Sequence, residues 1–244
     1  MRVGILSDIH GNIDALEAIL EEFERRGGVD KFVCLGDTVG YGADPDACCT
    51  KVREICEFSL LGNHDAAVGG RMDYSYYYDA ARDALDWCTR QLSKDNLEWL
   101  KSLPYTVREG NALYCHGSPL NPAEYDYIFA AEQARGLLGM RHELPTATFI
   151  GHSHLTKVFA LSEDDAMDVV APKFRMNDDM RYIVTVGSVG QPRDYDPRAC
   201  AGLYDTETDD FSYVRVEYDV ESQMKKIIDS GLAQNFGMRL LIGV

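Results

Sequence analysis

The sequence contains little positive charge. It has 24 lysines and arginines against 40 aspartates and glutamates, which gives a formal net charge of −16. A protein that binds the phosphates of duplex nucleic acid, or that binds an anionic membrane surface, needs a basic face. The composition therefore disfavours both kinds of partner. Much of the excess acid lies in polar stretches at 162–165 and 205–210, which are typical of solvated turns.

Long apolar runs and paired cysteine motifs are also missing. No stretch reaches the about 18 apolar residues that a membrane-spanning helix requires. The apolar run Val3–Leu6 is too short for a signal peptide, so we expect a soluble, cytoplasmic protein. The cysteines number seven and lack C-x-x-C spacing, which argues against a disulfide framework and a thiolate zinc site. We expect reduced and mostly buried thiols, with Cys115 in the core.

Five of the six histidines lie in short clusters of Asp, Asn, His and Gly, each of which follows an apolar run. Histidine and carboxylate side chains gathered at strand ends are what a pair of divalent metal ions needs. All donor atoms are nitrogen or oxygen, which suits Mn²⁺, Fe, Zn²⁺, Ni²⁺ or Co²⁺ rather than Ca²⁺ or a structural zinc. In chain order, the clusters contain Asp8 with His10, Asp37, Asn63 with His64, His116, and His152 with His154.

The first sixty residues alternate between strand and helix patterns. The predicted elements are strands over Val3–Leu6, Phe32–Leu35 and Ser59–Leu61, a helix that ends at Gly27, and a helix over Asp46–Phe58. This β-α-β-α-β order predicts parallel strands with right-handed crossovers. Ligand sites in such sheets gather at the carboxyl ends of the strands, where the first three clusters fall.

Two pairs of candidate ligands are separated by a single residue. Alternate residues of an extended chain point to the same side. We therefore expect Asp8 and His10 to aim at one place, and likewise His152 and His154.

Further helices are predicted over Tyr74–Leu92 and Asp95–Leu103, and after Pro104 short strands dominate. Turns at 163–166 and 206–210 predict antiparallel hairpins. No linker or internal repeat is visible, so residues 1–244 are interpreted as a single domain. The later elements are helices near Ala130–Met140 and Val220–Asp229 and strands over Thr106–Arg108, Ala112–Cys115, Thr148–Ile150, Lys157–Leu161, Asp168–Val170, Tyr182–Val186, Gly202–Asp205 and Ser212–Glu217.

The cluster order, D-x-H, GD, GNH, a lone H and GHxH, runs from Asp8 to His154 and resembles that of the calcineurin-like metallophosphoesterases. The run GSVGQPR, which ends at Arg193, resembles a late signature of their small bacterial and archaeal branch. That branch often has Asn-Pro where this chain has Thr185 and Val186. The resemblance implies an α/β fold, a four-layer α/β/β/α sandwich with two facing mixed sheets and a dimetal site at the strand carboxyl ends.

The resemblance also implies a reaction. Two divalent transition-metal ions, Mn²⁺ in the first place, would serve the hydrolysis of a small phosphomonoester or phosphodiester by direct attack of a metal-bound hydroxide. His64 would act as general acid or stabilise charge at the leaving group. The implied ligands are Asp8, His10 and His154 for one ion, Asn63, His116 and His152 for the other, and Asp37 as the bridge between them.

Three other functions remain open. An asymmetric diadenosine tetraphosphate hydrolase fits the tyrosines at 74, 76, 77 and 78, which either stack a nucleobase or pack one face of a helix. A non-catalytic metal-binding scaffold of the same fold would not require His64. A nuclease on long nucleic acid would need a local basic groove.

Two further residues are candidates for substrate contact, each with a second interpretation. Asn12 either contacts substrate or caps the helix that follows it. Arg193 either holds a substrate phosphate, for which its bidentate geometry is suited, or lies in a surface turn.

Overall fold

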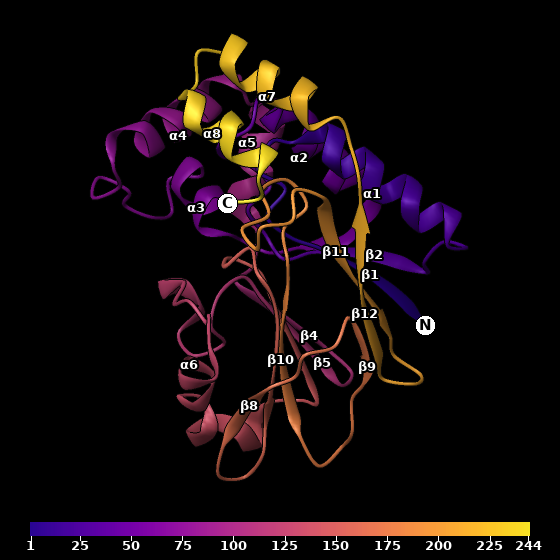
Figure 1. Ribbon diagram of the computed structural model, residues 1–244. Coiled ribbons are helices and arrows are strands. Elements are labelled where there is room, and N and C mark those ends of the chain that lie inside the picture. The colour runs from indigo at the N-terminus through magenta and orange to yellow at the C-terminus, as the bar shows by residue number, and fades with distance from the viewer.

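A computed structural model describes the whole chain, residues 1–244, and arranges it as two six-stranded sheets with helices outside them (Figure 1). The strands of the first sheet, in spatial order, are β3 (Cys56–Ser59), β2 (Lys31–Cys34), β1 (Arg2–Leu6), β11 (Ala199–Asp205), β12 (Asp210–Val216) and β9 (Lys173–Arg175). Those of the second are β4 (Thr106–Glu109), β5 (Ala112–Cys115), β6 (Ala147–Ile150), β10 (Arg181–Val186), β7 (Thr156–Leu161) and β8 (Ala166–Asp168).

Each sheet mixes parallel and antiparallel pairs. β1, β2 and β3 are parallel in the first sheet, and β5, β6 and β10 are parallel in the second. The predicted hairpins are confirmed as antiparallel pairs, with Leu161 opposite Ala166 and Asp205 opposite Asp210. The parallel strands matter for the site, because their carboxyl ends bring several loops to one edge.

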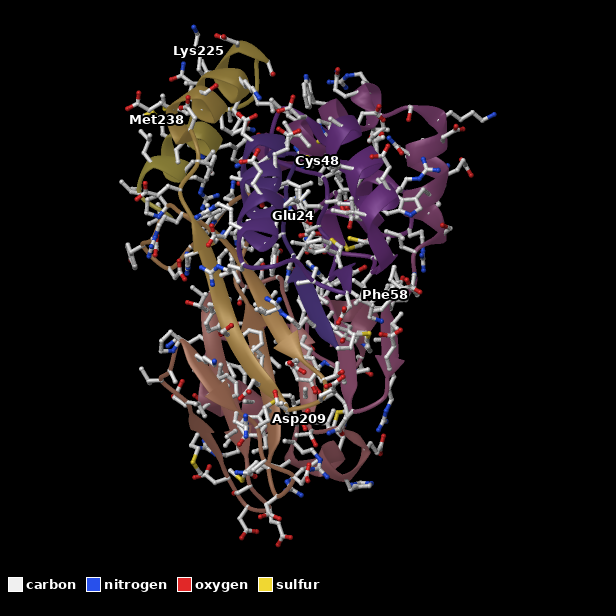
Figure 2. The ribbon with its side chains drawn as sticks, turned by 90° about the vertical axis from the view of Figure 1, so that its right-hand side faces the viewer. Glu24, Cys48, Phe58, Asp209, Lys225 and Met238 are labelled. Carbon is white, nitrogen blue, oxygen red and sulfur yellow. The ribbon has the colours of Figure 1, made fainter.

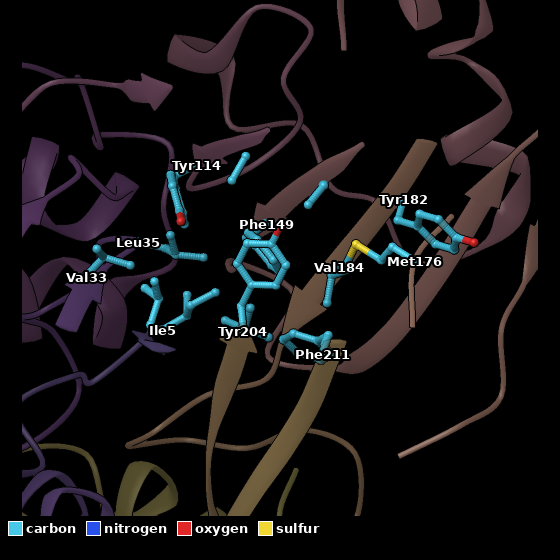
Figure 3. Close-up of a cluster of buried hydrophobic side chains, with 14 of the residues drawn as sticks. Ile5, Val33, Leu35, Tyr114, Phe149, Met176, Tyr182, Val184, Tyr204 and Phe211 are labelled. Atoms are coloured by element: carbon cyan, nitrogen blue, oxygen red, sulfur yellow. The ribbon is translucent and has the colours of Figure 1, made fainter. Parts of the chain in front are cut away.

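The two sheets face each other across a buried apolar layer (Figure 3). This layer forms because successive side chains of a strand point to opposite faces of the sheet. Ile5 and Val33 point into the layer, whereas the adjacent Leu6 and Cys34 pack outward against helices. Phe149 and Phe211 fill the space between the sheets, with ring centroids 5.7 Å apart.

Helices cover the outer faces of both sheets. α1 (Ile13–Arg25) and α2 (Pro45–Ile55) contribute to the cluster outside the first sheet, and α6 (Ala131–Arg135) to the one outside the second. The remaining helices gather beyond the strand ends, where Figure 2 shows Lys225 and Met238 at the same end of the molecule as Cys48. They are α3 (Asn63–Val68), α4 (Asp79–Gln91), α5 (Lys94–Ser102), α7 (Val220–Asp229) and α8 (Gln234–Met238), which the 3₁₀ turn η3 (Arg239–Leu241) follows. The 3₁₀ turn η1 (Pro122–Glu124) lies between β5 and α6, and η2 (Leu138–Glu143) follows α6 outside the second sheet.

The predicted ends of two early helices are wrong. α2 stops at Ile55 and β3 occupies Cys56–Ser59, whereas the sequence predicted helix through Phe58 and a strand over Ser59–Leu61. No glycine or proline separates the two elements, so pairing with β2 sets the boundary. The helix predicted from Tyr74 begins only at Asp79.

Two later predictions are also wrong in detail. The helix near Ala130–Met140 is a short α6 followed by the 3₁₀ turn η2, because Gly136 and Gly139 interrupt it. The strand predicted over Asp168–Val170 is largely absent, because β8 ends at Asp168 and the next strand, β9, begins only after Pro172. All seven cysteines are free, six of them buried. No helix combines the length and the apolarity needed to cross a membrane.

Candidate metal centre

Seven predicted ligands lie just after parallel strands, six of them in loops and Asn63 as the first residue of α3. The carboxyl ends of β1, β2 and β3 in one sheet and of β5 and β6 in the other meet at the same place, so these loops converge. None of the seven side chains belongs to a residue more than 6% exposed. The set, called the ligand cluster below, comprises Asp8, His10, Asp37, Asn63, His116, His152 and His154.

The backbone of the ligand cluster is not extended. Asp8, His10, Asp37, His152 and His154 have φ values between 48° and 64°, in the left-handed region. Single left-handed residues turn the chain sharply, and Asp and His tolerate them better than most residues do. The expectation that Asp8 and His10 aim together is met, since their donor atoms lie within 4.8 Å, but the reason given for it is wrong. A tight turn, rather than strand alternation, brings them together.

Glycines let the loops approach the carboxylates closely. A Cβ atom at Gly151 would lie 2.6 Å from Oδ2 of Asp8, and one at Gly62 would overlap the carboxylate of Asp37. Any larger residue would therefore displace neighbouring side chains, which at Gly151 include Ser7 as well as Asp8.

Three histidines of the cluster are oriented by backbone carbonyl groups. A carbonyl oxygen only accepts a hydrogen bond, so the ring proton of each histidine resides on Nδ1. In the neutral form of each ring, Nε2 then carries a lone pair that points into the cluster, as in metal sites where a ligand histidine donates its other N–H to a carbonyl. The Nδ1–carbonyl pairs are His10 with Val39 at 3.0 Å, His116 with Leu35 at 2.9 Å, and His154 with Gln191 at 2.5 Å.

One half of the cluster contains only acceptors. Nε2 of His10 and Nε2 of His154 lie 3.1 Å apart, and both carry lone pairs. Oδ1 of Asp8 lies 3.2 Å from Nε2 of His154 and 3.8 Å from Nε2 of His10. Three acceptors at these distances repel one another unless a positive charge lies among them, so these residues fit a cation.

The other half also brings the donor atoms of candidate ligands together. Nε2 of His116 lies 3.2 Å from Oδ1 of Asn63 and 3.3 Å from Oδ2 of Asp37. The Asn63 amide donates to the hydroxyl of Tyr77 at 2.9 Å, which turns its oxygen inward. A donor atom of His152 lies within 4.8 Å of those of Asp37 and His116.

Asp37 lies between the two halves. Its Oδ2 is 3.8 Å from Nε2 of His10 in the first half and 3.3 Å from Nε2 of His116 in the second. Its Oδ1 accepts a hydrogen bond from the backbone N–H of His64 at 2.8 Å. This is the position that a bridging carboxylate requires.

The electrostatics of the cluster favour bound cations. Burial lowers the pKa of His152 to about 3, and burial together with His154 lowers the pKa of His10. Burial alone would raise the pKa of Asp8, but His154 outweighs it and the pKa is lowered. Burial lowers the pKa of His116, but Asp37 raises it to about 9, so this position favours a positive charge. Neutral imidazoles and ionised carboxylates are the forms that bind metals.

Asp65, which the sequence reasoning left out of the site, connects two of the loops. Its carboxylate accepts hydrogen bonds from the backbone N–H groups of Thr38 at 3.0 Å, Val39 at 3.2 Å and Gly62 at 3.2 Å. Burial, reinforced by Asp37, raises the pKa of Asp65 to about 7. A carboxylate in the first turn of a helix directly after the GNH motif is the signal that could have indicated this role.

A cleft of about 470 Å³ opens onto the ligand cluster. Asp37, His152 and His154 contribute to its lining, together with His64 and Arg193. The Arg193 Nε atom is buried without a partner, while its terminal nitrogen donates to Gln191 at 3.2 Å. The predicted phosphate contact is thus placed beside the candidate metal ligands.

His64 lines the cleft and is only 4% exposed. Its ring packs edge-on against His10 with centroids 4.9 Å apart, and its Nδ1 is buried without a partner. Burial lowers the pKa of His64 to about 4.

Asn12 does not line the cleft. Its side-chain oxygen accepts from the backbone N–H of Ala15, and its amide donates to the carbonyl of Gly190 and the hydroxyl of Tyr218. The bond from Ala15 is that of a helix cap, the second interpretation of Asn12, and the other two tie the cap to distant parts of the chain.

Three of the four tyrosines singled out in the sequence line the cleft: Tyr76, Tyr77 and Tyr78. Tyr74 is directed elsewhere, since its hydroxyl donates to Asp86 at 2.6 Å. The interpretation of these rings as one face of a helix is wrong, because the segment before α4 is not helical. The sequence reasoning missed Tyr41, Tyr125 and Tyr127, which also line the cleft.

The chain resembles known proteins over most of its length. The model of the calcineurin-like phosphoesterase family matches residues 1–185. A protein of Methanocaldococcus jannaschii, described only as uncharacterized, is 33% identical over 245 residues, which cover 99% of this chain and 98% of that protein.

Solved structures agree with this similarity. The crystal structure of a metallophosphoesterase from Sphaerobacter thermophilus is 34% identical, with a TM-score of 0.85 over 100% of this chain and 99% of that one. A hypothetical protein from Pyrococcus horikoshii OT3 is 19% identical and shares the fold, with a TM-score of 0.78 over 100% and 98% of the two chains. The predicted α/β sandwich with two mixed sheets is confirmed.

Proposed function

The chain belongs to the calcineurin-like phosphoesterase family, and we propose that it is a metal-dependent hydrolase of small phosphate esters. The observation that carries this proposal is the set of acceptor atoms that face each other in the ligand cluster. Nε2 of His10 and of His154 lie 3.1 Å apart, although each ring donates through Nδ1. Such an arrangement is stable when cations lie between the acceptors.

We propose two ions, with Mn²⁺ as the first choice and Fe, Zn²⁺, Ni²⁺ and Co²⁺ as alternatives. Bound there, two divalent ions lower the pKa of water toward neutrality and neutralise charge on phosphoryl oxygens. Asp8, His10 and His154 would hold one ion, Asn63, His116 and His152 would hold the other, and Asp37 would contribute to both.

Arg193 and His64 would act on the substrate directly. The guanidinium of Arg193 has an unpaired Nε beside the ligand cluster, which suits a phosphate oxygen. His64 is neutral in the free protein at pH 7, and the negative charge of a bound phosphate would raise its pKa. In hydrolysis, a water molecule would lose a proton to solvent and its oxygen would bond to phosphorus while the bond to the leaving oxygen breaks. Protonated His64 would give its proton to that oxygen and regain one from solvent.

A non-catalytic scaffold is less well supported. Metal binding alone does not require His64 or Arg193 in the cleft, yet both line it beside the ligand cluster. The structure thus favours an enzyme over a binding module.

The test is product analysis with Mn²⁺-loaded protein. The substrates are a phosphomonoester, bis(p-nitrophenyl) phosphate and diadenosine tetraphosphate, and we expect turnover that chelation abolishes and added Mn²⁺ restores. Elemental analysis counts the ions in the same samples, with His142→Ala as control because this exposed histidine lies outside the cleft. Two bound ions without turnover of any ester would contradict the enzymatic proposal.

A further inference from the structure

The walls of the cleft carry an unusual concentration of tyrosine. Six tyrosines line it, at positions 41, 76, 77, 78, 125 and 127. Three of them, called the aromatic rim below, are well exposed: Tyr76 at 72%, Tyr78 at 55% and Tyr127 at 42%. Exposed aromatic rings gathered around one concave site are typical of a ligand-binding groove rather than of a core.

Two rings of the aromatic rim, those of Tyr76 and Tyr127, are held in place relative to the ligand cluster. Tyr76 packs edge-on against Tyr77 with centroids 5.0 Å apart, and the hydroxyl of Tyr77 accepts from the amide of Asn63. Tyr127 comes from a different loop and stacks on His152, with centroids 3.8 Å apart and planes inclined by 14°. A ligand that contacts the rim therefore lies at a defined position relative to the candidate metal ligands.

Charge distinguishes the outer part of the cleft from its floor. Arg193 is the only lysine or arginine among the lining residues, and it lies with the ligand cluster. The other side chain in the lining that is charged at neutral pH, apart from the cluster itself, is the carboxylate of the exposed Glu124. The outer cleft thus suits an uncharged group, and Glu124 can accept hydrogen bonds from hydroxyl or amino groups. A chain of several phosphates would lack cations to pair with.

From these observations, and resting on the proposed phosphoesterase function, we infer that the aromatic rim binds the base of a nucleotide that carries one phosphoryl ester. The phosphate would lie at the ligand cluster, the base against the tyrosine rings, and the sugar hydroxyls or base amino groups near Glu124. A cleft of about 470 Å³ is within the usual range for small-molecule sites. The net charge of −16 favours a mononucleotide over a polymer.

The experiment compares esters with similar leaving groups. Adenosine 5′-monophosphate, benzyl phosphate and glycerol 3-phosphate all release an alkoxide, and only the first carries a base. If the enzyme accepts only diesters, the p-nitrophenyl diesters of the same three alcohols replace them. We expect kcat/KM for the nucleotide to exceed that for the glycerol ester by about tenfold or more, as base stacking on aromatic rings predicts.

Variants test whether the rings of the aromatic rim cause the preference for the nucleotide. In Tyr76→Ala and in Tyr78→Ala, the ratio of kcat/KM for the nucleotide to kcat/KM for the glycerol ester should fall by about tenfold. Tyr195→Ala, which removes a ring that is 84% exposed outside the cleft, is the matched control and should leave the ratio unchanged. Far-ultraviolet circular dichroism verifies that each variant is folded.

The outcomes separate this inference from the proposed function. Turnover without preference for the nucleotide, or an equal preference for the benzyl ester, would overturn the inference and leave the phosphoesterase intact. If no ester is turned over, the proposed function fails, and calorimetric affinities for adenosine monophosphate and glycerol phosphate decide the inference alone. Equal affinities would overturn it, whereas tighter nucleotide binding that Tyr76→Ala abolishes would support it.

Discussion

The floor of the cleft and its aromatic rim are built in different ways. The floor is the ligand cluster, whose residues are buried, lie at the ends of parallel strands and are fixed by hydrogen bonds. The rim consists of exposed rings, Tyr76, Tyr78 and Tyr127, on segments between helices. Under the proposed function, the floor would carry the reaction chemistry and the rim would select the substrate. Changes in the floor should lower the rate of hydrolysis of every ester. Changes in the rim should alter the ratio of the kcat/KM values for different esters.

The largest effect is expected for Asp37→Asn. The neutral amide removes the negative charge that lies within 3.8 Å of His10 and 3.3 Å of His116, so both ions should bind poorly. We expect kcat to fall on the order of 10³-fold for all esters alike. Elemental analysis and steady-state kinetics check this, with Asp196→Asn as control because Asp196 pairs with Arg198 outside the cleft. Full metal content in Asp37→Asn would show that the bridging assignment is wrong.

His64 lines the cleft beside the floor without belonging to it, and His64→Gln should separate metal binding from proton transfer. Donor atoms of His64 lie within 4.8 Å of those of His10 and Asp37, but two other groups, Asp8–His10–His154 and Asp37–His116–His152, form without His64. We therefore expect both ions to remain bound in this variant. Loss of a general acid lowers kcat by about 10²–10³-fold for alkoxide leaving groups and less for p-nitrophenolate, which needs little protonation. Equal losses for both leaving groups would indicate that His64 stabilises charge without donating a proton.

The floor could be predicted from the sequence because its residues form short motifs. Asp8, Asp37 and Asn63 follow apolar runs that alternate with helices, and parallel strands bring such positions to one edge. The sequence did not show that Asp8 and Asp37 are left-handed, because Asp is compatible with several turn conformations.

The rim could be predicted only in part. Tyr76 and Tyr78 are close in sequence and were recognised as a candidate base-stacking segment, although the helix assigned to them is wrong. Tyr127 lies about 50 residues further along in an irregular loop, without periodicity or a motif to mark it. Its contact with the floor depends on tertiary packing, which no local pattern encodes. The single-domain interpretation of residues 1–244 stays a prediction.

Asp65→Ala should affect the folding of the floor more than its chemistry. The change leaves three buried backbone N–H groups, of Thr38, Val39 and Gly62, without their acceptor. Each unsatisfied donor costs about 1–3 kcal/mol, so we expect the free energy of unfolding to fall by roughly 3 kcal/mol or more. Urea unfolding of the metal-free protein measures this.

The control for this change is Asp165→Ala, which removes only an exposed ion pair with Arg135 and should cost less than about 1 kcal/mol. Asp65→Asn should lie between the two variants, because its amide oxygen can still accept from Thr38 and Val39. A stability loss in Asp65→Ala no larger than in Asp165→Ala would contradict the role of Asp65 in joining the loops.

The smallest effect is expected where rim and floor touch. His152 has no ring hydrogen bond, unlike the other three histidines of the cluster, and its ring is instead stacked on Tyr127. Tyr127→Ala should therefore weaken metal binding by about tenfold, as loss of an orienting partner does. Tyr127→Phe keeps the stacked ring and should bind metal as the parent protein does. Titration of the chelator-stripped protein with Mn²⁺ measures both.

Tyr76→Ala is the counterpart of Tyr127→Ala within the rim. Tyr76 belongs to the same rim but packs on Tyr77 rather than on a ligand histidine, so its loss should alter the ratio between esters while metal affinity is retained. Equal metal affinities for Tyr127→Ala, Tyr76→Ala and the parent protein would mean that Tyr127 does not orient His152. A tenfold lower Mn²⁺ affinity in Tyr127→Ala alone would show that this one rim residue, through its stacking on His152, also contributes to metal binding in the floor.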